Sequence, residues 1–270
     1  MIKSPLRYPG GKSRAIKVIL PLITKFDEFR EPFVGGGSIF LQLKQLYPQQ
    51  HFWINDLYTE LFTFWQQSQL NLQSVVSQVL QWKMQFPEGR ALYQFLLENR
   101  NHFNALERAS AFFIFNRITF SGTTEAGGFS EQAFQKRFTD SSIARLAQLN
   151  NLLAGVAITN EDYATLVQSP GKNVFIFLDP PYFSATKSAL YGKRGVLHKI
   201  FDHQYFAEVM KTCPHRWLIT YDDSSYIREL FDFSHIYEWN LMYGMRNQTP
   251  QSQQLGSELI ITNYPLKRHI

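Results

Sequence analysis

The sequence predicts an α/β protein in which a doubly wound, mostly parallel sheet is interrupted by a mainly helical insertion. Strand–turn–helix units occur at both ends of the chain, and the stretch between them has a mainly helical pattern. Asn173–Leu178 is a compact apolar run of β-branched and aromatic residues, which is typical of a buried strand in a parallel sheet. We therefore assign residues 1–58 and 160–270 to one sheet domain and residues 59–159 to an inserted domain.

The elements are expected in a definite order. The first 58 residues should form a loop, a helix, a short strand, a glycine turn, a helix and a strand ending at Asn55–Asp56. In the insertion, Gln66–Gln85 carries apolar residues at helical spacing and predicts one amphipathic helix, and Ser121–Ser130 predicts a polar loop. Beyond the buried strand, Trp217–Thr220 and Glu258–Thr262 are expected to be later strands.

Composition restricts the possible classes of protein. Of 270 residues, 44% are hydrophobic and 18% are charged, so the chain can fill a core and is not disordered as a whole. The single cysteine, Cys213, excludes an internal disulfide and a cysteine-rich zinc site, and we predict no metal site. No apolar run approaches the roughly 18–20 residues that span a bilayer. We expect a monomer without membrane contact in a reducing, cytoplasmic compartment.

The charge balance is mildly positive. Lys and Arg number 27 against 22 Asp and Glu, which gives a formal net charge of +5. This balance permits a polyanionic partner but does not require one.

Three glycines lie at a predicted strand-to-helix turn, in the segment Glu31-Pro32-Phe33-Val34-Gly35-Gly36-Gly37-Ser38. Glycines at such a turn let the backbone approach a ligand closely, and the following helix N-terminus can bind an anion such as a carboxylate. A flexible turn without function is the alternative interpretation. Phe40 stands where the dinucleotide fingerprint has its third glycine, which disfavours a nicotinamide enzyme.

Asp56 lies 21 residues after Gly35, at the tip of the next predicted strand. An acidic residue at this spacing is placed to bind ribose hydroxyls, although it could instead cap a helix that starts near Leu57. Near the N-terminus, Gly11-Lys12-Ser13 mimics the end of a phosphate-binding loop, but Leu6 occupies the required glycine position and no buried strand precedes it. An ATPase is therefore disfavoured, and a turn carrying Tyr8 and Lys12 could close over a nucleoside.

The tetrapeptide Asp179-Pro180-Pro181-Tyr182 directly follows the buried strand, where ligands of open α/β sheets bind. It suits the activation of an exocyclic amine on a nucleobase, whose lone pair is delocalised into the ring. The carboxylate of Asp179 and the carbonyl of Pro180 can accept the two N–H bonds and steer the lone pair toward an electrophilic methyl group, by positioning and electrostatics. Tyr182 offers a ring on which the base can stack. A tight turn that only ends the strand is the alternative.

These segments together resemble the DNA adenine methylase family, the Dam-type adenine-N6 methyltransferases of the alpha order. The similar segments are Arg7–Lys12, Glu31–Ser38, Asn55–Asp56 and Asp179–Tyr182, in the family's order of cofactor motifs, recognition domain and catalytic motif. Further similarity lies in Phe115–Arg117, Phe120–Gly122, Thr220–Asp223 and Glu258–Asn263. Tyr8 stands where members that methylate adenine in GATC often have Trp, so the recognition sequence does not carry over.

The resemblance implies a Rossmann-like methyltransferase sheet with a target recognition domain as its insertion. It implies S-adenosyl-L-methionine as methyl donor, double-stranded DNA as partner, and an adenine flipped out of the duplex. A nucleoid-associated location in a prokaryotic cell or a phage-infected host follows. The predicted catalytic residues are Asp179, Pro180 and Tyr182, and the predicted cofactor-binding residues are Tyr8, Lys12, Phe33, Gly35, Gly37, Ser38, Asp56 and Asp179.

The predicted DNA contacts lie in the insertion and after the tetrapeptide Asp179–Tyr182, which is the predicted catalytic turn. The polar loop could reach base edges or fill the gap left by a flipped base, and basic residues on loops beside a site are typical phosphate contacts. The predicted residues are Arg117, Ser121, Gly122, Lys136, Arg137, Lys193 and Arg194. Ordinary solvated surface is the alternative for many of these, and Arg117 could instead cap its own helix.

Three other functions remain open at this point. A cytosine-N4 DNA methyltransferase needs the same amine-steering geometry, although Asp rather than Ser at the head of the tetrapeptide favours adenine within the family pattern. An enzyme acting on RNA or on a protein amide would share the cofactor site, but the amide enzymes usually carry Asn in place of Asp179. A non-catalytic DNA-binding module would not bind S-adenosylmethionine.

Overall fold

The computed structural model describes residues 1–8, 10–122, 127–184, 201–241 and 256–266. Within them a seven-stranded sheet has the order β3-β2-β1-β4-β5-β7-β6. The strands are β1 (Glu28–Glu31), β2 (His51–Asn55), β3 (Ala157–Thr159), β4 (Val174–Leu178), β5 (Arg216–Asp222), β6 (His235–Leu241) and β7 (Gly256–Thr262). Strands β1 to β5 pair in parallel, and β7 runs antiparallel between β5 and β6. The predicted α/β class with a mostly parallel sheet is confirmed.

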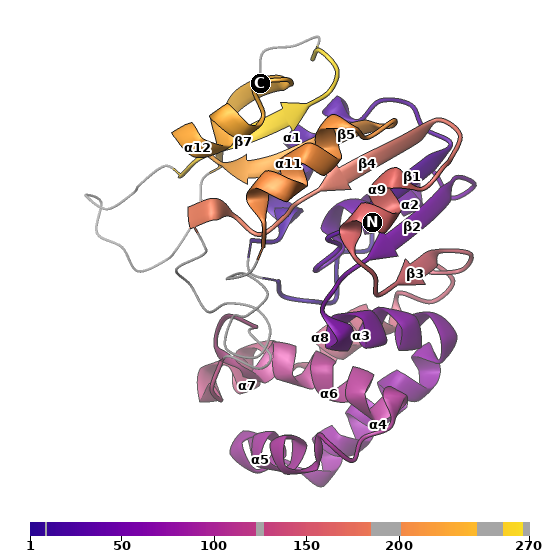
Figure 1. Ribbon diagram of the computed structural model, residues 1–270. Coiled ribbons are helices and arrows are strands. Elements are labelled where there is room, and N and C mark those ends of the chain that lie inside the picture. The colour runs from indigo at the N-terminus through magenta and orange to yellow at the C-terminus, as the bar shows by residue number, and fades with distance from the viewer. Residues whose placement is uncertain (9, 123–126, 185–200, 242–255, 267–270) are drawn as a thin grey trace.

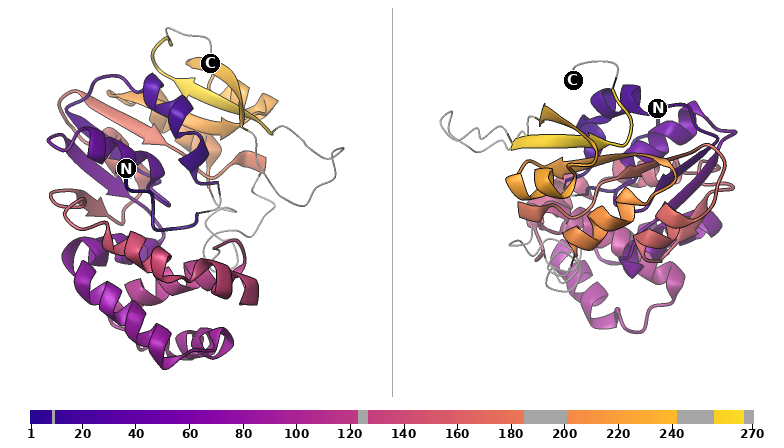
Figure 2. Two further views of the ribbon diagram at one scale, coloured as in Figure 1. Left: turned by 180° about the vertical axis from the view of Figure 1, so that it is seen from behind. Right: turned by 45° about the horizontal axis from the view of Figure 1, so that its top comes forward.

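Helices cover both faces of this sheet (Figures 1 and 2). On one face lie α9 (Tyr163–Gln168), α11 (His203–Lys211) and α12 (Ser225–Leu230), and on the other lie α1 (Ile16–Ile19) and α2 (Ser38–Leu46). Two short 3-10 turns, Lys12–Arg14 and Leu20–Leu22, flank α1. Strand β4 is buried along its whole length and supplies alternate side chains to the two cores, as a doubly covered strand must.

The insertion lies beyond the carboxyl ends of the parallel strands (Figure 1). Its helices are α3 (Thr59–Leu70), α4 (Leu72–Gln85), α5 (Gly89–Asn99), α6 (Ala105–Ile118), α7 (Glu131–Arg137) and α8 (Asp140–Ala147), with a 3-10 turn at Phe120–Gly122. Helix α6 is the centre and contacts α3, α4, α5 and α7. Asn104 and Glu107 form a capping box that fixes its start. No helix in the described ranges is long and apolar enough to cross a membrane.

Two features of the insertion differ from the sequence pattern. The prediction of one helix over Gln66–Gln85 is wrong, because the chain breaks at Asn71 (φ −139°, ψ 34°) between α3 and α4. Asn71 is both the C-cap of α3 and the N-cap of α4: its N–H donates to the Gln67 carbonyl at 2.8 Å, and its own carbonyl accepts the Val75 N–H at 3.0 Å. Strand β3 falls within the range assigned to the insertion, yet it pairs with β2 in the sheet.

Candidate active site

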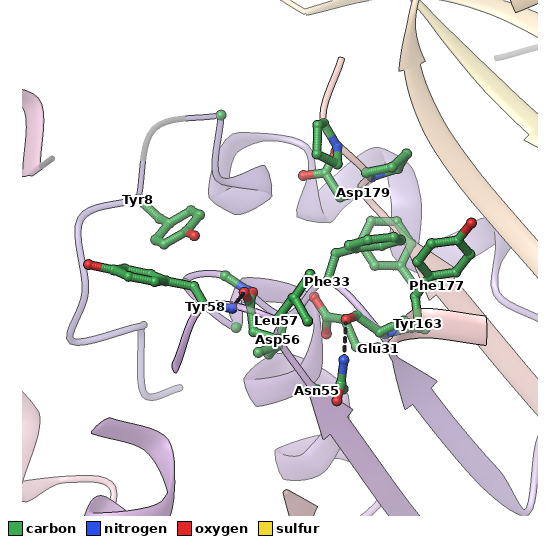
Figure 3. A pocket seen from close by; sticks show the side chains of 18 of the residues that line it. Tyr8, Glu31, Phe33, Asn55, Asp56, Leu57, Tyr58, Tyr163, Phe177 and Asp179 are labelled. Carbon is green, nitrogen blue, oxygen red and sulfur yellow. Dashed lines mark hydrogen bonds between the residues drawn. The ribbon is translucent and has the colours of Figure 1, made fainter. Parts of the chain in front are cut away.

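A cavity of about 480 Å³ opens at the carboxyl ends of the strands, where the sheet order reverses between β1 and β4. Ligands of open α/β sheets bind at such a point, and the volume suits a small molecule. Figure 3 shows side chains from distant parts of the sequence around the same space. The lining includes every residue predicted to bind a cofactor or to carry the catalysis: Tyr8, Lys12, Phe33, Gly35, Gly37, Ser38, Asp56, Asp179, Pro180 and Tyr182.

The glycine turn needs its glycines. Gly35 and Gly37 have φ values of +46° and +65°, which side chains rarely adopt. A Cβ on Gly35 would lie 2.8 Å from a ring carbon of Tyr8, and a Cβ on Gly36 would lie 2.9 Å from the Tyr8 Cβ. The turn is therefore a bare backbone surface on which Tyr8 rests, and the two together form one wall of the cavity.

Asp56 holds this turn from the adjacent strand. Its Oδ2 accepts the backbone N–H of Gly35 at 3.0 Å and its Oδ1 accepts that of Tyr58 at 3.0 Å. Helix α3 begins later, at Thr59, so Asp56 is not its N-cap. Burial raises the pKa of Asp56 to about 6, and the two backbone hydrogen bonds oppose this rise.

Asn55 ties three strand ends together. Its Nδ2 donates to the carbonyls of Pro32 at 3.1 Å and Glu161 at 2.9 Å, and its Oδ1 accepts from Thr159 Oγ1 at 2.8 Å and the Glu161 N–H at 2.9 Å. Both donors and both acceptor sites of the amide are used. The edge of the sheet beneath the cavity is thus fixed without a ligand.

Asp179 is bound on both oxygens. Lys12 Nζ lies 2.7 Å from Oδ1 and 2.9 Å from Oδ2, and Thr220 Oγ1 donates to Oδ1 at 2.7 Å. Lys12 is only 4% exposed, also donates to the Gly10 carbonyl at 3.1 Å, and lies 4.9 Å from the ring centroid of Tyr182. An ammonium group therefore already occupies the place between carboxylate and ring, which shows that the site can hold a nitrogen donor.

Tyr182 and Glu258 lie behind this ion pair. The Tyr182 ring stacks on Tyr221 with 6.0 Å between the centroids. Burial raises the pKa of Tyr182 well above its ordinary value, and the charges of Asp179 and Glu258 raise it further. Burial also raises the pKa of Glu258 to about 7, although the charge of Lys12 opposes the rise.

Hydrogen bonds hold the backbone where it leaves the catalytic turn. The backbone N–H groups of Phe183 and Ser184 donate to Asp222 Oδ1 and Oδ2, each at 2.8 Å. His203, at the start of α11, hydrogen-bonds the Tyr221 hydroxyl and packs its ring edge-on to Phe183 at 5.5 Å. His203 thus supports the segment after β4.

Sequence reasoning predicted Phe33 but missed the aromatic floor that it forms with neighbouring rings, and it missed one acidic residue after β3. Phe33 contacts Tyr163 and Phe201, with centroids 5.3 and 5.8 Å away, and these rings line the cavity together with Tyr205. Nothing in the sequence pattern separates these rings from ordinary core aromatics. Asp162, which caps α9 and also lines the cavity, follows β3, a three-residue strand too short to recognise from its pattern.

Acidic and aromatic side chains line the cavity together. Carboxyl groups of Glu31, Asp56, Asp162 and Asp179 reach it from four different strand ends. The aromatic floor suits a flat apolar ring, and the acidic walls suit hydroxyl donors and a cationic or amine group. Glu31 is buried and accepts the Phe40 N–H at 2.9 Å, and burial raises its pKa well above the ordinary value.

A cluster of arginines lies where the N-terminal segment meets the insertion. Arg117 is 4% exposed, its guanidinium lies 5.4 Å from the Phe113 ring, and its Nε and Nη2 have no hydrogen-bond partner among the described residues. Burial, together with the charges of Arg145, Arg7 and Arg137, lowers the pKa of Arg117 to about 10. Arg117 is not the cap of α6, because the C-cap is Thr119, whose N–H donates to the Phe115 carbonyl.

The other predicted DNA contacts are distributed unevenly. Lys136 and Arg137 are exposed in the last turn of α7. Gly122 (φ +77°) is buried against Arg7, where a Cβ would lie 2.6 Å from the Arg7 carbonyl oxygen. Ser121 is in the same 3-10 turn as Gly122. Lys193, Arg194 and the centre of the predicted loop at 123–126 lie outside the described residues.

Comparison with known families gives one match over most of the chain. Residues 8–245 match the model of the "D12 class N6 adenine-specific DNA methyltransferase" family. The matched range contains the glycine turn, the tetrapeptide and the whole insertion.

Individual relatives are distant. The DNA N-6-adenine-methyltransferase of Escherichia phage P1 is 25% identical over 85% of this chain, and modification methylase StsI of Streptococcus sanguinis is 29% identical over 72%. The matched part is only 31% of the length of each of these two relatives. The DNA adenine methylase of Vibrio cholerae is 24% identical over 84% of this chain and 83% of its own length.

Proposed function

The chain belongs to the D12 class N6 adenine-specific DNA methyltransferases, and we propose that it moves a methyl group from S-adenosylmethionine to N6 of an adenine flipped out of duplex DNA. One observation carries the proposal. The Lys12 ammonium sits between the Asp179 carboxylate and the Tyr182 ring, the place that an exocyclic amine would take.

The cavity fits the proposed cofactor. Asp56 is placed for the ribose hydroxyls, and the aromatic floor of Phe33 and Tyr163 suits the adenine ring. A cationic amino group and sulfonium suit the acidic wall, and the bare glycine backbone before α2 can receive the carboxylate. When bound, the cofactor would supply an electrophilic methyl group attached to its sulfonium. The rest of the cofactor would leave as a neutral thioether.

The residues of the tetrapeptide act on the amine. Asp179 accepts one N–H of the base, which must take an acceptor position from Lys12, and the Pro180 carbonyl accepts the other. The nitrogen lone pair then leaves the ring plane and points into the cavity, and Tyr182 stacks on the base. The N–C bond would form as the bond between the methyl group and sulfur breaks. The nitrogen, then positively charged beside Asp179, would release its proton to solvent.

The insertion provides the DNA-binding side. Arg7, Arg117, Arg137 and Arg145 raise the electrostatic potential at one place, and two nitrogens of Arg117 still lack acceptors among the described residues. Phosphate oxygens would supply those acceptors and relieve the repulsion. DNA anchored there would lie on the side of the sheet where the cavity opens, because the insertion lies beyond the same strand ends (Figure 1).

The test is methyl transfer with an identified product. Purified chain, duplex DNA and methyl-labelled S-adenosylmethionine should yield N6-methyladenine on hydrolysis of the DNA, and calorimetry should detect cofactor binding. Asp179→Ala should lower the rate about 1,000-fold, because the amine loses its principal acceptor. The double variant Lys12→Met with Asp179→Ala, which leaves no unpaired ammonium, serves as the folded control and should be equally inactive.

Three results would contradict the proposal in different ways. N4-methylcytosine as product would make the chain a cytosine enzyme with the same geometry. DNA binding without cofactor binding would make it a non-catalytic module. Asp179→Ala activity within tenfold of the wild type would remove the carboxylate from the mechanism.

A further inference from the structure

The catalytic turn is anchored by the neighbouring strand β5 at two points. At the start of the turn, Thr220 Oγ1 donates to Asp179 Oδ1 at 2.7 Å. At its end, the N–H groups of Phe183 and Ser184 donate to the two oxygens of Asp222, each at 2.8 Å. The two anchors are separated by a single residue on β5, and the residue that stacks the base, Tyr182, lies between the two anchored points.

Strand register fixes the first anchor. Leu178 on β4 pairs with Ile219 on β5, so the next residues along each strand, Asp179 and Thr220, are neighbours. Thr220 is fully buried, so its hydroxyl has little freedom to choose another acceptor. A carboxylate on a free rotamer would turn about its Cβ–Cγ bond, and the hydrogen bond from the Thr220 hydroxyl restrains that rotation.

The second anchor compensates for missing backbone donors. Pro180 and Pro181 have no N–H, so the turn cannot be closed by hydrogen bonds from its own first residues. The backbone N–H groups of Phe183 and Ser184 follow Tyr182 along the chain, and Asp222 accepts hydrogen bonds from both. These charge-assisted bonds hold the exit of the turn, although Phe183 and Ser184 are exposed at the surface.

We propose that Thr220 and Asp222 are positioning residues for methyl transfer: Thr220 orients the Asp179 carboxylate, and Asp222 fixes the backbone that carries Tyr182. The inference rests on the proposed function, in which Asp179 and Tyr182 receive the base. Neither residue touches the base. Each acts through a residue that does, and the loss of either should lower the turnover rate while cofactor binding is retained.

The first experiment removes one hydroxyl at constant shape. Thr220→Val should lower kcat about tenfold to a hundredfold and leave the KM for S-adenosylmethionine within about threefold of the wild type. Thr220→Ser restores the donor and should recover kcat to within about threefold. Thr262→Val is the matched control, because Thr262 is equally buried in β7 but donates to the Tyr264 carbonyl, away from the turn.

The second experiment has a readout that does not depend on activity. Asp222→Ala should speed the amide hydrogen exchange of Phe183 and Ser184 at least about tenfold and lower kcat, and Asp222→Asn, which keeps one acceptor, should give smaller changes in both. Asp223→Ala is the matched control, because the neighbouring carboxylate forms its ion pair with Arg228 instead of holding the turn.

The outcomes are distinguishable. If the wild type methylates DNA and Thr220→Val retains its kcat, or if Asp222→Ala leaves the exchange of both amides unchanged, the positioning roles are wrong and the proposed function stands. If the wild type transfers no methyl group to DNA, the proposed function fails and the inference fails with it. Should Thr220→Val not fold, the exchange measurement on Asp222→Ala decides.

Discussion

The cavity and the arginine cluster differ in how completely their buried polar groups are hydrogen-bonded. At the cavity, Asn55 uses all of its hydrogen-bonding capacity, and Asp179 is bound by Lys12 and Thr220. At the junction of the N-terminal segment and the insertion, Arg117 is just as buried, yet Nε and Nη2 lack partners among the described residues, and three arginines add repulsion. One polar region is hydrogen-bonded without a ligand, whereas the other leaves two buried nitrogens without acceptors in the described part of the chain.

This difference corresponds to two requirements of the proposed reaction. Chemistry on a poorly nucleophilic amine requires acceptors that are already in place, so that no reorganisation is needed in the transition state. Capture of a polyanion requires donors that are left unused, and their burial destabilises the free protein. The cavity should therefore lose stability when a partner is removed, and the arginine cluster should gain it.

The largest expected effect is at the cavity. Asp179→Ala should lower the free energy of unfolding by about 3 kcal/mol or more, because it leaves the buried ammonium of Lys12 unpaired. Combining it with Lys12→Met should recover most of this loss in denaturant unfolding.

Asp140→Ala is the control for that experiment, since Asp140 forms a surface ion pair with Lys83 and is 90% exposed. It should change the free energy of unfolding by less than about 1 kcal/mol. Equal losses for Asp179→Ala and Asp140→Ala would mean that the pairing at the cavity has no special weight.

The second effect has the opposite sign. Arg117→Met keeps an apolar stem beside Phe113 and removes the buried charge, so it should raise the free energy of unfolding by about 2 kcal/mol. It should also weaken DNA binding about tenfold and reduce the slope of binding against salt concentration by about one phosphate contact. Thermal unfolding and a salt titration measure the two quantities.

Lys136→Met is the comparison for Arg117→Met, because Lys136 is a basic residue of the same insertion but is exposed. It should leave the free energy of unfolding within about 0.5 kcal/mol of the wild type. A loss of stability in Arg117→Met would show that Arg117 is a satisfied structural residue, and the contrast between the two regions would disappear.

The smallest effect concerns pH. Burial raises the pKa of Glu258 to about 7, above its ordinary value, so the folded state holds this proton more tightly than the unfolded state does. The resulting stabilisation is complete below the pKa of the unfolded chain and is lost as pH rises through about 7. Between about pH 6 and pH 8 the wild type should lose about 1 kcal/mol of stability from this group, and Glu258→Gln should show a flatter profile.

The contribution of Asp56 to stability also falls as pH rises, since burial raises its pKa to about 6. Its contribution is largely lost below the pH interval in which Glu258 titrates, so the two can be separated in unfolding curves measured at several pH values. A Glu258→Gln profile as steep as the wild type would assign the slope to another group.

Local motifs predicted the cavity well, and non-local contacts escaped prediction. The glycine turn, Asp56 and the tetrapeptide each follow a strand, so their place at one edge of a parallel sheet could be inferred from the chain alone. Thr220 and Asp222 were visible only as parts of a matching segment, because their partners are fixed by the register of β4 and β5. Roles that depend on which strands become neighbours need the assembled sheet.

The details of the insertion were harder to predict, because they too depend on contacts between elements distant in the sequence. A break such as that at Asn71 depends on how two helices must both reach α6, and the helical spacing of apolar residues continues across it. The burial of Arg117 likewise arises from surrounding helices, and an arginine in an amphipathic pattern normally indicates exposure. The sequence therefore indicated that the region was helical and basic without indicating which charge is buried.

The side-chain amide of Asn116 joins the N-terminal segment to the insertion. Its Oδ1 accepts the Arg7 N–H at 2.8 Å, and its Nδ2 donates to the carbonyls of Arg7 at 2.7 Å and Gly122 at 3.2 Å. The residue after Arg7 is Tyr8, which covers the glycine turn. A displacement of the insertion would therefore reach the cavity wall formed by Tyr8 through one peptide unit. If DNA binding at the proposed surface causes such a displacement, the affinities for DNA and for the proposed cofactor will each change the other by the same factor.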